Sequence, residues 1–317
     1  MSSTFWKILE VEDRQDIIHL SEALNIPQSL ARLLVMRKIR TYDEAKKFFR
    51  PDISYLHDPF LMDGMELATG RVIQAITENE KIMIYGDYDV DGTCSTALMY
   101  MFLKELNADV HYYIPNRMKE GYGISPLGID FAKSMGVTLM ISVDCGITAI
   151  EETDYAKSQG IDLIICDHHK PKDVLPAAYA VLDPLKPECK YPFKYLSGAG
   201  VAFKLAQGIS ERAGIQEKPL KYLDLVALAG AADIVPLTDE NRILVTEGLH
   251  IINKNPRPGI AALIKVSRIP EGHLSSGQIV FSLAPRINAA GRLSDAKVAV
   301  ELLVTENMAE AERLAQA

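Results

Sequence analysis

Short apolar runs recur along the middle of the chain, with helix-forming stretches between them. The apolar runs, which we predict to be β-strands, are 81–86, 109–114, 138–143, 161–166 and 179–182. The stretches predicted to be helical between them are 94–106, 126–135 and 148–158. Apolar strands that alternate with helices are typical of a parallel sheet covered on both faces. The pattern therefore predicts an α/β fold, with a doubly wound, mainly parallel five-stranded sheet and helices on both of its faces.

Both flanks of this pattern are predicted to be helical. Before the strands, apolar residues recur at helical spacing in 13–25 and 27–38, and Thr41-Tyr-Asp-Glu44 has the form of a capping box. Beyond residue 197 the predicted helices are 198–213, 219–232, 239–253, 256–266, 275–282 and 295–304. We expect a helical N-terminal lead-in over 1–65, an α/β domain with a helical C-terminal portion over 66–304, and the start of a connecting helix over 305–317.

The composition excludes several classes of protein. With 317 residues, 48% of them hydrophobic, the chain can bury a substantial core. No apolar run approaches the roughly 18 residues that a membrane span needs, and the first residues do not resemble a signal peptide. The four cysteines have no CxxC spacing and lie in or beside apolar runs, as reduced core cysteines do. We therefore expect a cytoplasmic protein without a membrane partner, a disulfide framework or structural zinc.

The formal net charge is −8, from 42 acidic and 34 basic residues. This balance disfavours broad electrostatic adhesion to nucleic acid. Two bound divalent cations would, however, place four positive charges at one point, so the net charge does not exclude a polyanionic substrate at a metal site.

Acidic residues and histidines directly follow four of the five predicted strands. They are Asp87, Asp89 and Asp91 after the first, Asp144 after the third, Asp167, His168 and His169 after the fourth, and Asp183 after the fifth. The carboxyl ends of parallel strands share one edge of the sheet, where such folds bind ligands. In an extended segment residues i and i+2 point the same way, so alternating aspartates can reach one cluster. Helix capping explains a single Asp, and a solvated acidic turn explains 84–93, but neither explains four strand ends.

The types of side chain indicate which metal would bind. Carboxylates with one or two imidazoles and no thiolate favour Mn²⁺ or Mg²⁺. The ligands exceed the needs of one ion, so we expect two ions about 3.5–4 Å apart. Asp233, in GAADIVPLTDENR, could complete the cluster, although for this residue taken alone an ordinary N-cap before Ile-Val-Pro is the favoured explanation.

Three segments have features of phosphate-binding sites. They contain basic side chains, glycines or an expected helix start. The candidate residues are Arg117 in IPNRMKEGYGIS, Ser197, Gly198 and Gly200 in LSGAGVAFKLA, and Arg286, Asn288 and Arg292 in APRINAAGRLSDA. A surface loop with solvated arginines explains the third segment equally well. Neither a Walker A lysine motif nor a GxSxG elbow is present.

Together these motifs resemble the DHH phosphoesterase superfamily, and within it the branch of single-strand-specific exonucleases. The resemblance spans roughly residues 80–295. Its elements are YGDYDVDGTCS, IPNRMKEGYGIS, SVDCGI, DHHKP, SGAGVAFKL, GAADIVPL and APRINAAGR. DHH alone is a weak signal, whereas seven motifs in the same order are specific.

The resemblance implies a phosphodiesterase with two Mn²⁺ (or Mg²⁺) ions that removes mononucleotides from single-stranded DNA in the 5′→3′ direction, in DNA repair and recombination. It implies single-strand-binding protein and a helicase as further partners. The implied metal ligands are Asp89, Asp91, Asp144, His168 and Asp233, with Asp144 bridging and Asp87 ligating or supporting. The implied catalytic residues are Asp144, His168 and His169. The implied DNA contacts are Arg286, Asn288 and Arg292, assisted by Arg117 and the 197–200 loop.

Two other functions are consistent with the same motifs. One is a DHH phosphodiesterase or phosphatase for short oligonucleotides or cyclic dinucleotides, which the acidic net charge mildly favours. The other is a non-catalytic scaffold, which the complete set of carboxylates disfavours. The second, glycine-rich domain of the family is not found in this sequence, and we expect residues 305–317 to lead toward it.

Overall fold

The computed structural model describes residues 14–293 and 296–316, except for the side chains of 290–293. The chain divides into two compact units, one ending at Tyr55 and one beginning at Leu56. This division falls earlier than residue 65, where the sequence pattern placed the end of the lead-in. Among the described residues, no helix combines the length and the apolar character that crossing a membrane requires.

The first unit is a small helical assembly. Its elements are α1 (Arg14–Leu24), α2 (Gln28–Met36), α3 (Tyr42–Phe49) and the short 3₁₀ helix η1 (Ile53–Tyr55). Its core is formed by Leu20, Ala31, Leu34, Val35, Ile39 and Ala45. The predicted capping box is confirmed, because the Glu44 amide donates to Thr41 Oγ1 over 3.2 Å and the Thr41 amide donates to Glu44 Oε2 over 3.0 Å.

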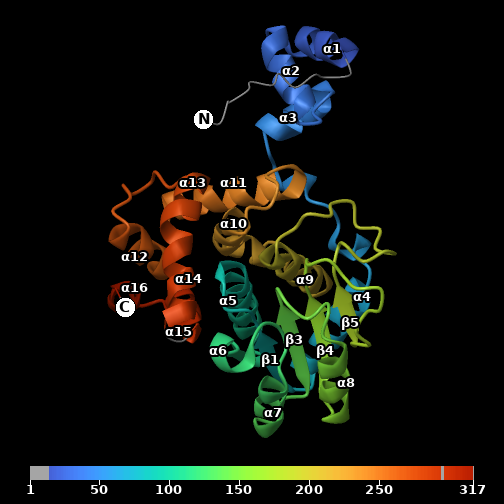
Figure 1. Cartoon of the computed structure of the whole chain (residues 1–317), viewed down its shortest axis with the longest axis vertical. Helices are drawn as coiled ribbons and strands as arrows, with labels where there is room; N and C mark the ends of the chain where they lie inside the picture. The colour runs from blue at the N-terminus through green and yellow to red at the C-terminus, as the bar shows by residue number, and fades with distance from the viewer. Residues whose placement is uncertain (1–13, 294–295, 317) are drawn as a thin grey trace, which may run out of the picture. The chain divides into compact units, whose positions relative to one another are not determined.

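The second unit is built on a five-stranded sheet (Figure 1). Its strands are β1 (Lys81–Tyr85), β2 (Asp109–Tyr113), β3 (Leu139–Val143), β4 (Asp162–Cys166) and β5 (Ala180–Leu182). Their order is β2-β1-β3-β4-β5 and every pairing is parallel. The five predicted strands and the predicted α/β class are thereby confirmed. The strands carry apolar side chains on both faces, which is why both faces must be covered.

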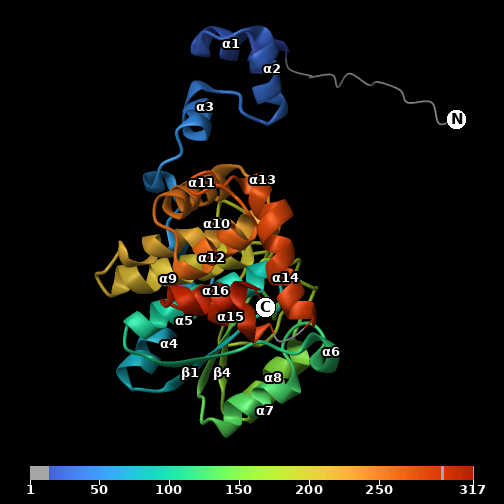
Figure 2. The ribbon, with the colours of Figure 1, turned by 90° about the vertical axis from the view of Figure 1, so that its left-hand side faces the viewer.

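Helices cover both faces of the sheet, which lies between them in the view of Figure 2. One face packs against α4 (Met65–Thr77), α5 (Val90–Glu105) and α9 (Gly198–Arg212). The other face packs against α7 (Pro126–Ser134) and α8 (Ile150–Ser158). The core on the second face includes Met83, Met140, Leu163, Ile165 and Ala156.

The remaining elements of the second unit are helical. They are η2 (Pro59–Leu61), α6 (Arg117–Glu120), η3 (Lys218–Tyr222), α10 (Leu223–Ala232), α11 (Asp239–Lys254), α12 (Pro258–Val266), α13 (Ser276–Gln278), the π-helical η4 (Ile279–Leu283), α14 (Ala284–Leu293), α15 (Lys297–Val304) and α16 (Met308–Gln316). α10 packs on α5 and α11, α15 packs on α5, and α16 packs on α12. The helical C-terminal portion is therefore continuous with the α/β layer.

One predicted helix start is wrong, and one alternative that the sequence left open is decided. α5 begins at Val90 instead of residue 94, so Asp91 lies in a helix. The segment around Arg286, for which a surface loop was an alternative, forms helix α14.

Candidate metal centre

The aspartates that follow β1 do not share one extended segment, as the alternation had suggested. Asp89 is the N-cap of α5, where its Oδ1 accepts from the Gly92 amide over 2.9 Å. Asp91 lies in the first turn of α5, and Asp87 precedes the cap. Asp87 and Asp89 nevertheless offer ligand atoms within 4.8 Å of each other, as expected for that pair, whereas the helical turn places Asp91 in a different group of side chains.

Asp144 lies directly after β3 at the middle of the sheet edge. It is buried, and its backbone has φ +61°, a left-handed conformation that non-glycine residues rarely adopt. A Cβ at Gly198 would lie 2.5 Å from Asp144 Oδ1. The start of α9 can therefore approach Asp144 only because residue 198 is glycine.

The two histidines follow β4 and are fixed by the buried Asp167. Asp167 Oδ1 accepts from the His168 amide over 2.7 Å, the His169 amide over 3.1 Å and His169 Nδ1 at 2.7 Å. Its Oδ2 accepts from the Ile147 amide over 2.9 Å. Burial is the largest influence on Asp167 and opposes its ionisation, but the hydrogen bonds from His169 and the Ile147 amide and the charge of His169 together hold the Asp167 pKa below its ordinary value. Asp167 thus orients the His169 imidazole and fixes the backbone that carries His168.

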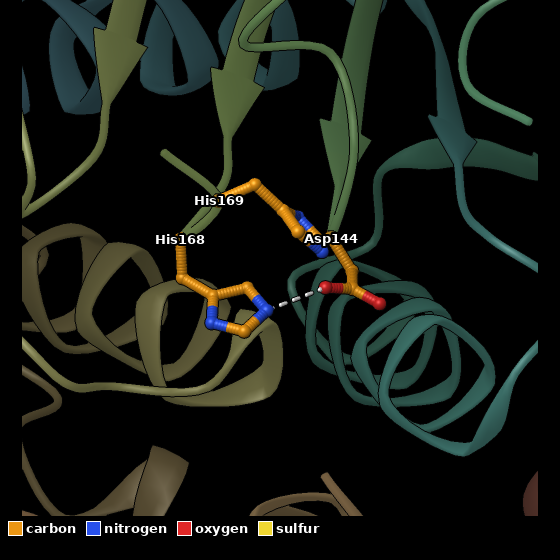
Figure 3. Close-up of side chains that lie close together, drawn as sticks. All are labelled: Asp144, His168 and His169. Atoms are coloured by element: carbon orange, nitrogen blue, oxygen red, sulfur yellow. Dashed lines mark ion pairs between the residues drawn. The ribbon is translucent and has the colours of Figure 1, made fainter. Parts of the chain in front are cut away.

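The His168 ring is directed at the Asp144 carboxylate (Figure 3). Its Nε2 lies 3.1 Å from Asp144 Oδ1, 3.7 Å from Asp91 Oδ2 and 3.9 Å from Asp233 Oδ2. Four of the predicted metal ligands, from β3, β4, α5 and the end of α10, therefore meet at one point.

The described side chains form three groups in which each member offers a ligand atom within 4.8 Å of the others. The groups are Asp91, His168 and Asp233; Asp87, Asp89 and Asp144; and Asp144, His168 and His169. All six side chains predicted to bind metal occur in these groups. The first two groups are separate, and Asp144 lies beside both, which is the arrangement that two ions sharing one carboxylate require.

The electrostatics of the cluster favour a bound cation. Burial, followed by the charge of Asp89, raises the pKa of Asp87 to about 7. Burial raises the pKa of Asp91 to about 6 and that of Asp233 above its ordinary value. Burial and the neighbouring carboxylates also raise the pKa of Asp144 well above its ordinary value. Asp87 Oδ1 is buried without a hydrogen-bond partner in the described part of the chain. Divalent cations with oxygen and imidazole ligands fit this set, because they supply the missing positive charge.

One of the predicted phosphate-binding segments, 197–200, differs from expectation in what it contacts. The Gly198 and Ala199 amides donate to the two Asp91 carboxylate oxygens, each over 2.7 Å, and the Gly200 amide donates to Ser197 Oγ over 3.2 Å. The start of α9 therefore holds Asp91, and these amides are not free to form the expected phosphate cradle. Arg117 reaches the rim of the cluster, with its Cζ 5.0 Å from the centre of the Tyr88 ring.

The third segment lies on α14, which packs beside α5. Arg286 is exposed there, and Asn288 has a buried Oδ1 without a partner among the described residues. The side chain of Arg292 lies outside the described residues. The structure thus places Arg286 and Asn288 next to the helix that carries Asp91, but it does not bring them into the carboxylate cluster.

Sequence reasoning overlooked two contributors to the site. The Tyr122 hydroxyl lies 3.3 Å from the Asp144 backbone oxygen and 3.3 Å from His169 Nδ1. Together with Glu152 and His169, Tyr122 lines a cavity of about 250 Å³ beside the centre. A Cβ at Gly92 would lie 2.6 Å from Asp87 Cβ, so this glycine makes room for Asp87. Tyr122 belongs to the IPNRMKEGYGIS motif, but no local pattern in the sequence connects it with Asp144.

Residues 81–230 match the DHH family, N-terminal domain. The chain belongs to the DHH family. It is 44% identical over 310 residues to the single-stranded-DNA-specific exonuclease RecJ of Bacillus subtilis (strain 168), covering 98% of this chain and 39% of that protein. It is 37% identical over 318 residues to RecJ of Escherichia coli (strain K12), covering 96% of this chain and 54% of that protein. The chain therefore spans about half or less of the length of these DHH proteins.

The fold agrees with solved structures of the DHH family. The crystal structure of RecJ from Thermus thermophilus in complex with Mn²⁺ superposes with a TM-score of 0.82 and 32% identity, covering 98% of this chain and 44% of that chain. A second structure, of exonuclease RecJ bound to manganese, gives a TM-score of 0.75 and 36% identity, and the match covers 84% of this chain and 66% of that chain. The predicted family resemblance is thus confirmed.

Proposed function

We propose that this chain carries the catalytic centre of a metal-dependent exonuclease that degrades single-stranded DNA to mononucleotides in the 5′→3′ direction. The observation that carries the proposal is the convergence of carboxylates and imidazoles into two groups that adjoin at Asp144. The similarity to RecJ of Bacillus subtilis and Escherichia coli, both named single-stranded-DNA-specific exonucleases, supports this substrate.

The cofactor we propose is a pair of Mn²⁺ or Mg²⁺ ions. Asp87, Asp89 and Asp144 would hold one ion, and Asp91, His168 and Asp233 the other, with Asp144 shared. Solved structures of the Thermus RecJ contain Mn²⁺ or Mg²⁺, which supports both choices. When bound, such ions acidify water and neutralise charge on the phosphate that reacts.

The protein's own side chains would position the substrate. Asp167 holds His169 through Nδ1, which leaves Nε2 as the ring nitrogen for the scissile phosphate. Arg117 at the rim, and Arg286, Asn288 and Arg292 on α14, would bind phosphates of the DNA backbone. Since Asp91 occupies the amides at the start of α9, we assign that turn to the support of the metal centre.

We also propose a wider context for this domain. We assign residues 66–304 to the DHH catalytic domain and 305–317 to the connection with a second domain, which the greater length of the relatives supports. DNA repair and recombination in the cytoplasm, with single-strand-binding protein and a helicase as partners, is the role we propose. The four buried, unpaired cysteines are consistent with a reducing compartment.

The test is product analysis with Mn²⁺ on 5′- and 3′-labelled single-stranded DNA, a matched duplex and a dinucleotide, with Asp144→Ala alongside. We expect early release of labelled mononucleotide from the 5′-labelled single strand only, and none with the variant. Cleavage of the dinucleotide alone would favour the small-substrate alternative, which the acidic net charge also suits. Release from the 3′ end, or activity that survives in Asp144→Ala, would contradict the proposal.

A further inference from the structure

We infer that Glu120 is a positioning residue, whose carboxylate holds the 116–125 loop so that Arg117 and Tyr122 lie over the metal centre. The inference rests on the proposed function for its effect on DNA, but the hold on the loop can be tested without DNA. Glu120 is the last residue of the four-residue helix α6 and is not a member of the groups of described side chains that could bind metal.

The Glu120 carboxylate accepts hydrogen bonds from three places. The Asn116 amide donates to Oε1 over 2.7 Å, the Ser125 hydroxyl donates to Oε2 over 2.5 Å, and the Tyr113 hydroxyl lies 3.0 Å from both oxygens. Asn116 and Ser125 are the two ends of the loop, and Tyr113 is the last residue of β2. One carboxylate therefore joins both ends of the loop to the sheet.

A second tyrosine extends this anchor to β1. The buried Tyr85 hydroxyl donates to the Gly123 oxygen and accepts from the Ser125 amide, each over 3.1 Å. The loop between these anchors depends on Gly121 and Gly123, which have φ +83° and +87°. Because glycine has little intrinsic preference, side-chain hydrogen bonds must select the conformation of the loop.

The anchored loop carries one residue that lies beside the centre, Arg117, and one that contacts it, Tyr122. Arg117 lies over the ring of Tyr88, which stands between Asp87 and Asp89. The Tyr122 hydroxyl lies 3.3 Å from the backbone oxygen of Asp144. Among the described residues, the hydrogen bonds of Glu120 go to the loop and to β2 and none goes to the cluster, so its influence on the centre passes through this loop.

The experiment compares Glu120→Ala and Glu120→Gln with Glu151→Ala, which removes an exposed carboxylate from α8. The first readout is trypsin cleavage after Arg117 and Lys119 in the native protein. We expect Glu120→Ala to accelerate it about tenfold and Glu120→Gln less, since the amide keeps one acceptor oxygen. The melting temperature of each variant shows whether the whole fold is retained.

The second readout is steady-state hydrolysis of single-stranded DNA with Mn²⁺. Glu120→Ala should raise KM about tenfold and leave the affinity for Mn²⁺ within about twofold. If Glu120 acts through Arg117 and Tyr122, adding Glu120→Ala to the double variant Arg117→Ala, Tyr122→Phe should cause no further loss. Additive losses, or a fall in Mn²⁺ affinity parallel to the loss of activity, would overturn the inference.

The two readouts separate the inference from the proposed function. A wild-type chain that does not hydrolyse single-stranded DNA would count against the proposed function, while the trypsin readout would still test Glu120. Unchanged cleavage at Arg117 and Lys119 in Glu120→Ala would overturn the inference whether or not the enzyme is active.

Discussion

Helix α9 contributes to two buried groups of charges, and only one of them is balanced within the protein. Lys204, in the body of α9, is fully buried and lies 2.6 Å from the fully buried Glu240. Glu240 also accepts from the His57 amide over 2.9 Å and the Tyr191 hydroxyl over 2.6 Å, and Lys204 donates to the His57 oxygen over 2.9 Å. Each charge in this pair therefore has an opposite charge and further hydrogen bonds.

The start of α9 faces the carboxylate cluster, where the balance is different. Several buried carboxylates there meet two imidazoles, and the pKa values of Asp87, Asp91, Asp144 and Asp233 are all raised. A buried group of like charges without compensation destabilises a fold unless a ligand brings the opposite charge. The comparison indicates that the Lys204 pair serves the structure and that the cluster is built for an external cation.

The largest effect should come from removing the shared carboxylate. Asp144→Asn should lower the rate of mononucleotide release about 10⁴-fold, because neither group of ligands is complete without Asp144. Its melting temperature without metal should not fall, since the substitution removes a carboxylate that repels its neighbours. A variant that retains a tenth of the wild-type rate would show that Asp144 is not shared by two ions.

Breaking the buried ion pair of Lys204 and Glu240 should instead lower the stability of the fold. Lys204→Met should lower the free energy of unfolding by about 3–5 kcal/mol, because Glu240 is left buried without its counter-charge. Urea titration measures the change. Adding Glu240→Gln, which removes the uncompensated charge and keeps an acceptor for Tyr191, should recover about half of the loss. A loss below about 1 kcal/mol in Lys204→Met would mean that the pair is not fully desolvated.

The sheet and the general position of the site could be predicted from the sequence. Strands that are apolar on both faces, such as Leu139–Val143, have few alternatives to a covered parallel sheet. Parallel strands in turn bring Asp144 and His168 to one edge, whatever the details of the loops.

Contacts between distant segments could not be predicted in this way. The hydrogen bond from the Gly198 amide to the Asp91 carboxylate joins positions that are 107 residues apart in the sequence. No local pattern indicates that the start of α9 would face a carboxylate. The start of α5 was placed too late because the polar residues around Asp89 resemble a loop, whereas Asp89 acts as an N-cap. Local patterns therefore located the charged residues, but only the packing shows which of them hold the others in place.

Binding of Mn²⁺ should stabilise the protein through the cluster alone. At a free concentration of about 100 times the dissociation constant, one site adds about 2.7 kcal/mol. Thermal unfolding with and without Mn²⁺ measures this shift. Lys204→Met should show the same metal-dependent shift as the wild type from a lower starting temperature, whereas Asp144→Asn should lose most of it. Equal shifts in both variants would contradict the distinction between the two groups of charges.

An effect of similar size to the metal-dependent shift concerns pH in the absence of metal. Unfolded aspartates titrate near 3.8, whereas the folded-state pKa is about 7 for Asp87 and about 6 for Asp91. Between these values the native state holds protons that the unfolded state has released, so raising the pH favours unfolding. The destabilisation of the native state by these two carboxylates is complete above about pH 7, and it is relieved as the pH falls toward about 4.

In the presence of a metal chelator, the free energy of unfolding should therefore rise by about 3 kcal/mol when the pH falls from 8 to 5.5, of which Asp87 contributes about 2 kcal/mol and Asp91 about 1 kcal/mol. Asp87→Asn should flatten this dependence, while Lys204→Met combined with Glu240→Gln should shift the whole curve downward without changing its slope, because that double variant leaves no titratable group at the pair. Saturating Mn²⁺ should abolish the dependence or reverse its sign, because protons then compete with the metal for the same carboxylates. A metal-free protein that becomes less stable over this range as the pH falls would show that the carboxylates are already compensated within the fold.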